Sequence, residues 1–335
     1  MFDRDKLNRI ANQLKGIEDE VIALSVSCNE WFTEKSVRRA INSVVNEYLD
    51  SEKLMQWWSS YSNLPVQEPS TVMVVTAGNI PLVGFFDLFC SVLVGHQVLL
   101  KPSSRDYHLM SYAAKLLNRE FGDKIKIVDS IDNRADALLF MGSDAVADEL
   151  RALWSDKLHL IRSHRISIAL ISGNESSQQL ELLADDVFAY YGLGCRNVTN
   201  VFIPKGYDLM KLVGVFNNYQ MDSEEYRQIV RRHVARMSVC GEKFVAGDFF
   251  VFKEGFSSEL PMGELRWIEY DNVNQLRNFI DDNEMHLQCV VSDDVSIDSW
   301  RCVPFGRAQQ PALKDFPDRV DVIQFLQKIV TFAKQ

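Results

Sequence analysis

The sequence predicts an α/β protein of two lobes, the first of them built on a doubly wound parallel sheet. Short apolar runs alternate with helical segments from residue 71 onward. The runs are apolar on both faces, which is typical of parallel strands that helices cover on each side. The chain has 335 residues. One hydrophobic core rarely serves so long a chain, so two lobes are expected.

The first 62 residues predict a helical cap. Apolar residues recur at three- and four-residue steps, which indicates amphipathic helices. The two stripes consist of Leu7, Ile10, Leu14 and Ile17, and of Val37, Ile41, Val44 and Tyr48. Because each helix has only one apolar face, we expect the cap to pack on the larger structure that follows.

Strands and helices alternate over the rest of the first lobe. We expect strands at 71–78, 98–102, 124–130, 135–142, 158–163 and 166–172, with helices at 80–95, 105–120 and from 144. Ligands bind such sheets at the carboxyl ends of the strands. We therefore predict a dinucleotide-binding domain with its helical cap at residues 1–172, completed by about residues 311–335.

A second α/β series predicts a catalytic domain at residues 173–310. We expect a helix to about Tyr191, strands at 197–204, 243–255, 265–270 and 287–294, and helices at 208–219 and 222–236. A last helix at 318–333 is expected to return to the first lobe.

Composition narrows the function classes. The formal net charge of −10 disfavours nucleic-acid binding, because an acidic chain repels phosphate backbones. No run reaches the roughly 18 uncharged apolar residues that a membrane span needs, and the polar N-terminus is unlike a signal peptide. Six cysteines without CxxC spacing argue against zinc and against disulfides. We expect a cytoplasmic protein without a bound metal.

Four short segments carry residue types suited to chemistry. They are Thr76-Ala77-Gly78-Asn79-Ile80-Pro81, Lys101-Pro102-Ser103-Ser104, Phe140-Met141-Gly142-Ser143 and Gly192-Leu193-Gly194-Cys195. No GxGxxG follows the first strand, so a dinucleotide would have to bind in another way. Each segment alone has an ordinary explanation. Asn79 suits a helix N-cap, and Cys195 suits a small buried hydrophobic residue.

In this order the four segments resemble the aldehyde dehydrogenase superfamily, and most closely its LuxC-type acyl-CoA reductases, over roughly residues 71–325. The stretches 190–198 and 310–313 are particularly similar to that branch. The resemblance implies an aldehyde-dehydrogenase-like fold, with Cys195 as the nucleophile and the Asn79 amide in an oxyanion hole. It implies cofactor contacts from Thr76, Gly78, Lys101, Pro102, Ser104, Arg105, Phe140, Gly142 and Ser143. Met141 departs from the pattern, because it replaces a threonine.

A second departure concerns the direction of the reaction. Aldehyde-oxidising members carry a glutamate about thirty residues before the cysteine, and this glutamate activates water for hydrolysis of the acyl-enzyme. Leu170 is expected to stand at that position, which would favour reduction of a thioester over oxidation of an aldehyde. Glu175 lies five positions later and is the alternative candidate for the base.

The resemblance therefore implies an NAD(P)H-dependent reductase. The Cys195 thiolate attacks an acyl thioester, and reduced nicotinamide then delivers hydride to release an aldehyde. Ser104 stands where NAD-preferring members often have glutamate, so it leaves room for a 2′-phosphate that Arg105 would pair with. NADPH is favoured and NADH stays open, since a solvent-exposed helix start also explains these residues. Arg196 either assists the thiolate or forms a surface salt bridge.

The implied substrate is an acyl-CoA or acyl-carrier thioester. The chain is shorter than typical members of the superfamily, which leaves little room before Thr71 for the hairpin that joins many family oligomers. A shortened protein would need a partner enzyme that takes the acyl group or the aldehyde, and a homodimer also stays open. Two other functions stay open. One is an aldehyde dehydrogenase that oxidises aldehydes to acid or acyl-CoA, and the other is a catalytically idle nucleotide- or acyl-binding subunit.

Overall fold

The computed structural model describes residues 3–162, 164–293 and 302–332. The chain divides into two compact units, one of residues 1–164 with 310–335 and one of residues 165–309. Each unit has its own mainly parallel sheet. The α/β fold class predicted from the sequence is confirmed.

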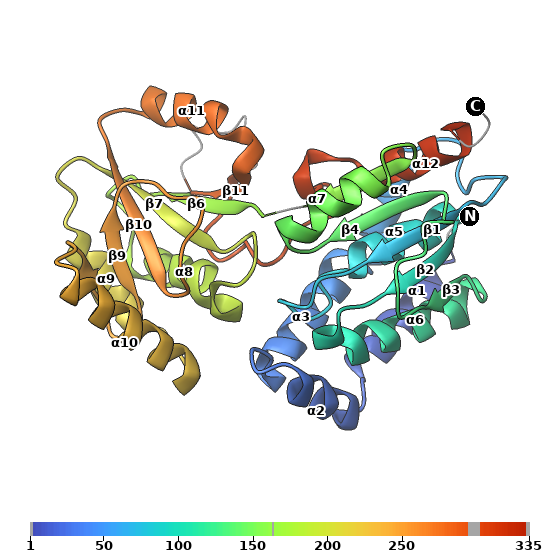
Figure 1. The fold of residues 1–335 in the computed structure, drawn as a ribbon, viewed down its shortest axis with the longest axis horizontal. Helices are drawn as coiled ribbons and strands as arrows, with labels where there is room; N and C mark the ends of the chain where they lie inside the picture. The colour runs from blue at the N-terminus through green and yellow to red at the C-terminus, as the bar shows by residue number, and fades with distance from the viewer. Residues whose placement is uncertain (1–2, 163, 294–301, 333–335) are drawn as a thin grey trace. The chain divides into compact units, whose positions relative to one another are not determined.

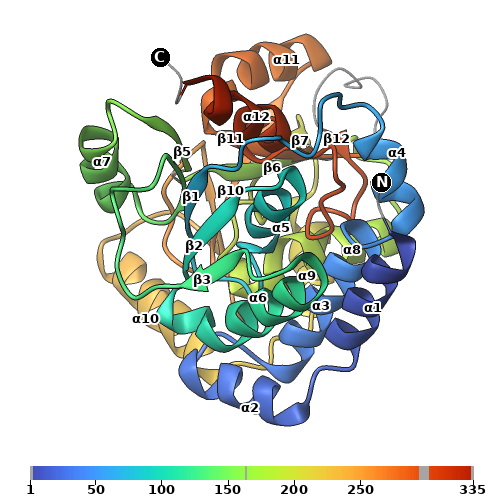
Figure 2. The same cartoon turned by 90° about the vertical axis from the view of Figure 1, so that its right-hand side faces the viewer.

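The first unit contains a five-stranded sheet in the order β3-β2-β1-β4-β5. Its strands are β1 (Thr71–Val75), β2 (Gln97–Lys101), β3 (Ile125–Ile127), β4 (Ala137–Met141) and β5 (Leu158–Arg162), and all pairs are parallel. Figure 2 shows β1, β2 and β3 in this order. The chain runs from β1 through β2 to β3 and then resumes at β4 on the other side of β1. A topological switch point therefore lies between β1 and β4.

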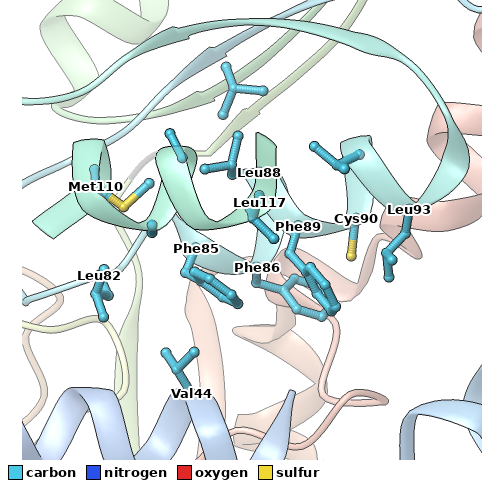
Figure 3. Packing of buried hydrophobic residues seen from close by; sticks show 14 of the residues in the cluster. Val44, Leu82, Phe85, Phe86, Leu88, Phe89, Cys90, Leu93, Met110 and Leu117 are labelled. Carbon is cyan, nitrogen blue, oxygen red and sulfur yellow. The ribbon is translucent and has the colours of Figure 1, made fainter. Parts of the chain in front are cut away.

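Helices cover both faces of this sheet (Figure 1). Alternate residues of β1 point to opposite faces. Val72 and Val74 join the core under α5 (Phe85–Val94) and α6 (Tyr107–Phe121). Met73 and Val75 join a second cluster under α7 (Asp144–Leu153). Figure 3 shows the side chains packed around α5.

The helical cap packs outside α5 and α6. It consists of α1 (Arg4–Lys15), α2 (Asp19–Cys28), α3 (Glu34–Glu47) and α4 (Ser51–Trp58). The α1 and α2 helices contact α6, while α12 (Val322–Phe332) contacts α5. The predicted stripes account for this packing, because Leu7, Ile10 and Leu14 of α1 are all buried. No helix among the described residues is long and apolar enough to cross a membrane.

The second unit contains a seven-stranded sheet in the order β12-β11-β6-β7-β10-β9-β8. Its strands are β6 (Ile166–Leu170), β7 (Val198–Pro204), β8 (Val245–Ala246), β9 (Val251–Glu254), β10 (Glu264–Tyr270), β11 (Leu287–Val291) and β12 (Cys302–Val303). The pairing of β8 with β9 is antiparallel and the other pairings are parallel. The expected strand at 243–255 is thus a short hairpin.

Helices again lie on both faces of the second sheet (Figure 1). The α8 (Ser177–Phe188), α9 (Leu209–Asn217) and α10 (Glu224–Val239) helices cover one face, and α11 (Val273–Asp282) covers the other. An aromatic cluster fills the first of these faces, where Phe188 of α8 meets Phe216 of α9 and Phe250. Leu276 and Ile280 of α11 pack on Ile168 and Phe202 on the opposite face.

The structure differs from the sequence prediction at the junction of the units. The strand expected at 166–172 was assigned to the first lobe, but β6 lies inside the second sheet, between β11 and β7. The division of the chain therefore falls after residue 164 in place of residue 172. A buried strand is apolar on both faces whichever sheet it joins, so its pattern does not identify its neighbours.

Candidate active site

The three first-lobe segments singled out by the sequence come together at the carboxyl edge of the five-stranded sheet. Val75 at the end of β1 pairs with Lys101 of β2 on one side and with Phe140 of β4 on the other. The residues that follow these strands therefore lie at one edge, around the switch point. This edge carries Thr76, Gly78, Asn79, Lys101, Pro102, Ser104, Arg105, Phe140, Gly142 and Ser143.

The loops after β1 and β2 pack tightly against each other. The backbone N–H of Thr76 donates to the Lys101 carbonyl at 3.1 Å. A Cβ atom on Gly78 would lie 2.6 Å from Ser103 Oγ and 2.9 Å from Arg105 Cβ. Glycine is therefore required here by close approach, and the two loops form one surface. Ser104 and Arg105 remain exposed on it.

The loop after β4 ends in an accessible helix start. A Cβ atom on Gly142 would lie 2.4 Å from the Phe140 ring, so glycine allows the ring to fold over the backbone. Ser143 is exposed and is the N-cap of α7, and its side chain makes no capping hydrogen bond in the described structure. Backbone N–H groups at a helix start favour anions. Asp144 in the first turn opposes this effect, although its carboxylate accepts from the His164 N–H at 2.8 Å.

Cys195 belongs to the second unit, where it follows a left-handed turn. The helix α8 ends at Phe188. Tyr190, Tyr191 and Gly192 then have φ values of 53°, 59° and 72°. A left-handed conformation costs a residue other than glycine about 1–2 kcal/mol. Such strain persists only where the surrounding contacts hold the backbone, and Cys195 itself is exposed.

Two buried side chains hold this turn. The Asn197 side-chain oxygen accepts from the Gly194 N–H at 2.8 Å, and the Ser167 hydroxyl donates to the Cys195 carbonyl at 2.9 Å. The Asn197 nitrogen donates to three carbonyls where α8 ends, those of Asp186, Val187 and Ala189, at 3.1, 3.1 and 2.8 Å. The backbone on both sides of the thiol is therefore fixed, and the negative end of α8 is partly neutralised.

A second thiol, that of Cys289, contacts the Ser167 hydroxyl that holds the Cys195 carbonyl. Cys289 Sγ lies 3.1 Å from Ser167 Oγ, and both residues are fully buried. The single Ser167 hydroxyl proton is donated to the Cys195 carbonyl. The thiol of Cys289 is therefore the donor in its own contact with Ser167.

Arg196 is not a surface residue. It is 9% exposed, and its Nε donates to the Ala308 carbonyl. The carboxylate of Asp186 accepts from the N–H groups of Gly306 and Ala308 at 2.6 and 2.9 Å. The alternative of a surface salt bridge for Arg196 is wrong, because the side chain is buried beside the loop at 306–308.

Leu170 does not lie where a base for Cys195 would have to be. Parallel pairing matches Ser167 with Val198 and Leu170 with Phe202. Cys195 lies before β7, beside Ser167, whereas Leu170 is three residues farther along β6, about 10 Å away at the strand rise. Its side chain joins Ile168 and Phe202 in the cluster under α11. The expected alignment of Leu170 with the hydrolytic glutamate is therefore wrong.

Glu175 is an equally poor candidate for the base. Its carboxylate accepts from the Ser172 N–H, the Ser172 hydroxyl and the Gly173 N–H at 2.6, 2.8 and 3.0 Å. These contacts close the loop after β6, at the edge of the sheet opposite to the start of β7. Glu175 thus stabilises a turn.

Sequence reasoning missed Ser167 and Asn197, and it also missed Asn29 and Asp106 in the first unit. Asn197 had one signal, because it stands two residues after Cys195 in the segment that resembles the LuxC branch. The other three lie outside every matched segment. Among residues 3–162, 164–293 and 302–332, no group of three His, Cys, Asp or Glu side chains is placed to hold a metal ion.

Comparison with known proteins adds a family and a fold. A model of the family described as acyl-CoA reductase (LuxC) matches residues 3–212, which is more than half of the chain. No curated protein gives a significant sequence match.

Solved aldehyde dehydrogenases are similar in structure. Aldehyde dehydrogenase 21 from Physcomitrella patens, in complex with succinate, superposes with a TM-score of 0.70 at 12% identity, covering 97% of this chain and 83% of that one. The aldehyde dehydrogenase KauB from Pseudomonas aeruginosa superposes with a TM-score of 0.69 at 13% identity, covering 97% of this chain and 82% of that one. The NAD+ complex of an aldehyde dehydrogenase from Bacillus cereus gives 0.67 at 13% identity, covering 91% and 76%. At such identities the similarity establishes the fold.

Proposed function

The chain belongs to the acyl-CoA reductase (LuxC) family, and we propose that it reduces an acyl thioester to an aldehyde through an acyl intermediate on Cys195. The observation that carries the proposal is the turn at Cys195. This cysteine is exposed after a strained left-handed turn, and Ser167 and Asn197 fix its backbone. A strained and over-determined backbone beside a nucleophilic residue is typical of a catalytic turn.

The proposed chemistry on Cys195 is acyl transfer. Its thiolate attacks the thioester carbonyl, the bond to the leaving thiol breaks, and a new thioester to Cys195 forms. The negative charge on the tetrahedral oxygen needs N–H donors, and we assign this role to the Asn79 amide and to the Cys195 backbone N–H. When the aldehyde leaves, the sulfur of Cys195 recovers its electron pair as a thiolate.

The carboxyl edge of the five-stranded sheet is the proposed cofactor site. When bound there, a reduced nicotinamide dinucleotide supplies the hydride for reduction of the acyl group. Lys101 and Arg105 offer positive charge to the phosphates. Gly78 supports this surface because it lets the loops after β1 and β2 pack against each other. Exposed Ser104 beside exposed Arg105 leaves room for a 2′-phosphate, so we propose NADPH as the preferred cofactor.

The family supports reduction of a thioester over oxidation of an aldehyde. Leu170 no longer supports this direction. The position of Leu170 beneath α11 removes the argument from a missing base. What remains is the match to acyl-CoA reductases, which also favours coenzyme A as the thiol of the substrate. A homodimer stays a prediction, which light scattering on the purified protein will test. A partner enzyme that takes the acyl group or the aldehyde also stays a prediction.

Intact-protein mass spectrometry tests the proposal. The protein is incubated with an acyl-CoA in the absence of cofactor, and we expect the mass of one acyl group, which NADPH then removes as aldehyde. The Cys195→Ala variant should not be acylated. Cys240→Ala is the matched control, because Cys240 is another exposed cysteine of the same unit, and it should behave like the wild type. Cofactor binding without acylation would refute the proposal in favour of a binding subunit, and aldehyde oxidation without thioester reduction would reverse its direction.

A further inference from the structure

The segment between Gly78 and Leu82 is held at both ends by buried side chains that have no assigned role. This segment contains Asn79 and begins three residues after the end of β1. At its start, the side-chain nitrogen of Asn29 donates to the Gly78 carbonyl at 2.8 Å. At its end, the Asp106 carboxyl accepts from the Leu82 N–H at 2.9 Å. Both contacts lie within the first unit.

Asn29 is fixed in place by its own contacts. It is 3% exposed, and its side-chain oxygen accepts from the Trp31 N–H at 3.0 Å. Its nitrogen also lies 3.4 Å from the Arg105 carbonyl. One amide of the helical cap therefore reaches the loop after β1 and the loop after β2, and its orientation is determined by the Trp31 contact.

Asp106 holds a residue in an unfavourable conformation. Leu82 has a φ of 59°, which costs a residue with a Cβ atom roughly 1–2 kcal/mol. Its side chain is anchored in the same apolar cluster as Phe85 and Met110 (Figure 3). The Asp106 carboxyl is 1% exposed and faces the Leu82 N–H. The left-handed residue is thus held by its side chain in the core and by its N–H on Asp106.

From this geometry we infer that Asn29 and Asp106 are positioning residues for Asn79. Asn29 fixes the peptide group directly before Asn79, and Asp106 fixes the backbone three residues after it. Neither side chain needs to touch the substrate. The inference rests on the proposed function, since it deepens the role given there to the Asn79 amide. It also gives the helical cap a part in the active site.

The two residues differ in what they should affect. Asn29 reaches both loops, so Asn29→Ala should slow acylation of Cys195 and also weaken NADPH binding, each by about ten-fold for one lost hydrogen bond. The Asp106 side chain makes its hydrogen bond to the segment after β1, and its other oxygen has no hydrogen-bond partner among the described residues. Asp106→Ala should therefore slow acylation by a similar factor and leave the NADPH dissociation constant unchanged.

Two isosteric variants should give opposite results. Asp106→Asn keeps an oxygen that accepts from the Leu82 N–H, so it should restore acylation to near the wild-type rate. Asn29→Asp keeps the shape but loses the donor to the Gly78 carbonyl, so it should remain as slow as Asn29→Ala. If an alanine variant does not fold, these two isosteric variants still test the inference.

Asn118→Ala is the matched control for lost stability. The Asn118 side chain, like that of Asn29, is hydrogen-bonded to backbone through both its nitrogen and its oxygen. Both bonds are to Ile125 at 2.8 Å, and neither involves a proposed site residue. Asn118→Ala should lower the melting temperature about as much as Asn29→Ala does, while the acylation rate and NADPH binding stay unchanged.

A double-mutant cycle with Asn79→Ala decides whether the effect passes through Asn79. We expect Asn29→Ala to cause no further loss of acylation rate in that background, because the group that it positions is already absent. Additive losses, or an unchanged acylation rate in Asn29→Ala and Asp106→Ala, would refute the inference. A wild-type protein that acyl-CoA does not acylate would refute the proposed function itself, so the two failures are distinguishable.

Discussion

Replacing Leu170 with glutamate tests whether this position has any connection with Cys195. If Leu170 stood at the position of a hydrolytic base, Leu170→Glu would create an acyl-CoA hydrolase. The structure predicts instead that the variant loses stability and gains no hydrolysis. Leu170 is 3% exposed under α11, and the strand runs about 10 Å from Ser167 to the end at which Leu170 lies.

The expected cost follows from that burial. Loss of a fully buried leucine side chain removes about 1.5–3 kcal/mol of apolar burial. A lone carboxyl among Ile168, Phe202 and Leu276 would have to stay protonated at neutral pH. Raising its pKa by about three units costs roughly 4 kcal/mol. The total, about 5–7 kcal/mol, is comparable with the entire stability of a typical domain, about 5–15 kcal/mol.

Urea denaturation and thiol release from acyl-CoA without NADPH are the two measurements. Leu170→Met is the control, because it conserves volume and should cost less than about 1.5 kcal/mol. Leu170→Glu should unfold at a much lower urea concentration, and its folded fraction should release thiol no faster than the wild type. A stably folded Leu170→Glu protein that hydrolyses acyl-CoA, and stops doing so when Cys195→Ala is added, would refute the placement of Leu170.

Four further outcomes are expected. Asn79→Ala should slow acylation by roughly two to three orders of magnitude, the scale of one oxyanion donor, with NADPH binding measured by fluorescence nearly intact. Ser104→Glu should shift the ratio of kcat/KM values from NADPH toward NADH, because a carboxylate repels a 2′-phosphate. Gly78→Ala should cost about 1–3 kcal/mol and weaken NADPH binding, since its Cβ would meet Ser103 and Arg105, whereas Gly214→Ala, with nothing within 4 Å of its Cβ, should be tolerated in both assays. Burial raises the pKa of Asp106 above 3.8, so the folded state keeps a proton that the unfolded chain loses. The wild-type unfolding free energy should therefore fall, relative to Asp106→Asn, as pH rises from about 4 toward the raised pKa.

The sequence was sufficient for the elements whose pattern is local. Strands β1, β2 and β4 were predicted as apolar runs, and their joint edge gathers Thr76, Lys101 and Phe140 as parallel topology requires. The strand β6 was predicted as an element and assigned to the wrong sheet. Its neighbours are β7 and β11, far along the chain, and nothing in its own residues indicates them.

The contacts that fix the candidate site were beyond local reasoning. Asn29 reaches Gly78 across 49 positions, Asp106 reaches Leu82 across 24, and Ser167 reaches Cys195 across 28. Single hydrogen bonds between distant positions leave no periodic signal in a sequence. The prediction for Leu170 was wrong for a related reason. The number of residues between a position and a cysteine does not show which end of a strand the position occupies, because that depends on the register of strand pairing.

The first unit is built from two segments that are far apart in the sequence, and this affects the order in which it can fold during synthesis. Residues 1–164 and 310–335 form one unit, and residues 165–309, which lie between them in the sequence, form the other. The later segment closes the core of the earlier one, since α12 covers α5, the His96 ring contacts the Leu326 carbonyl at 3.0 Å, and the Tyr61 hydroxyl donates to Asp321 at 2.8 Å. A ribosome therefore releases the five strands of the first sheet long before the helix that covers α5. Until then the apolar surface of α5 stays open to chaperones or to other nascent chains, while residues 165–309 can complete their own sheet and core first.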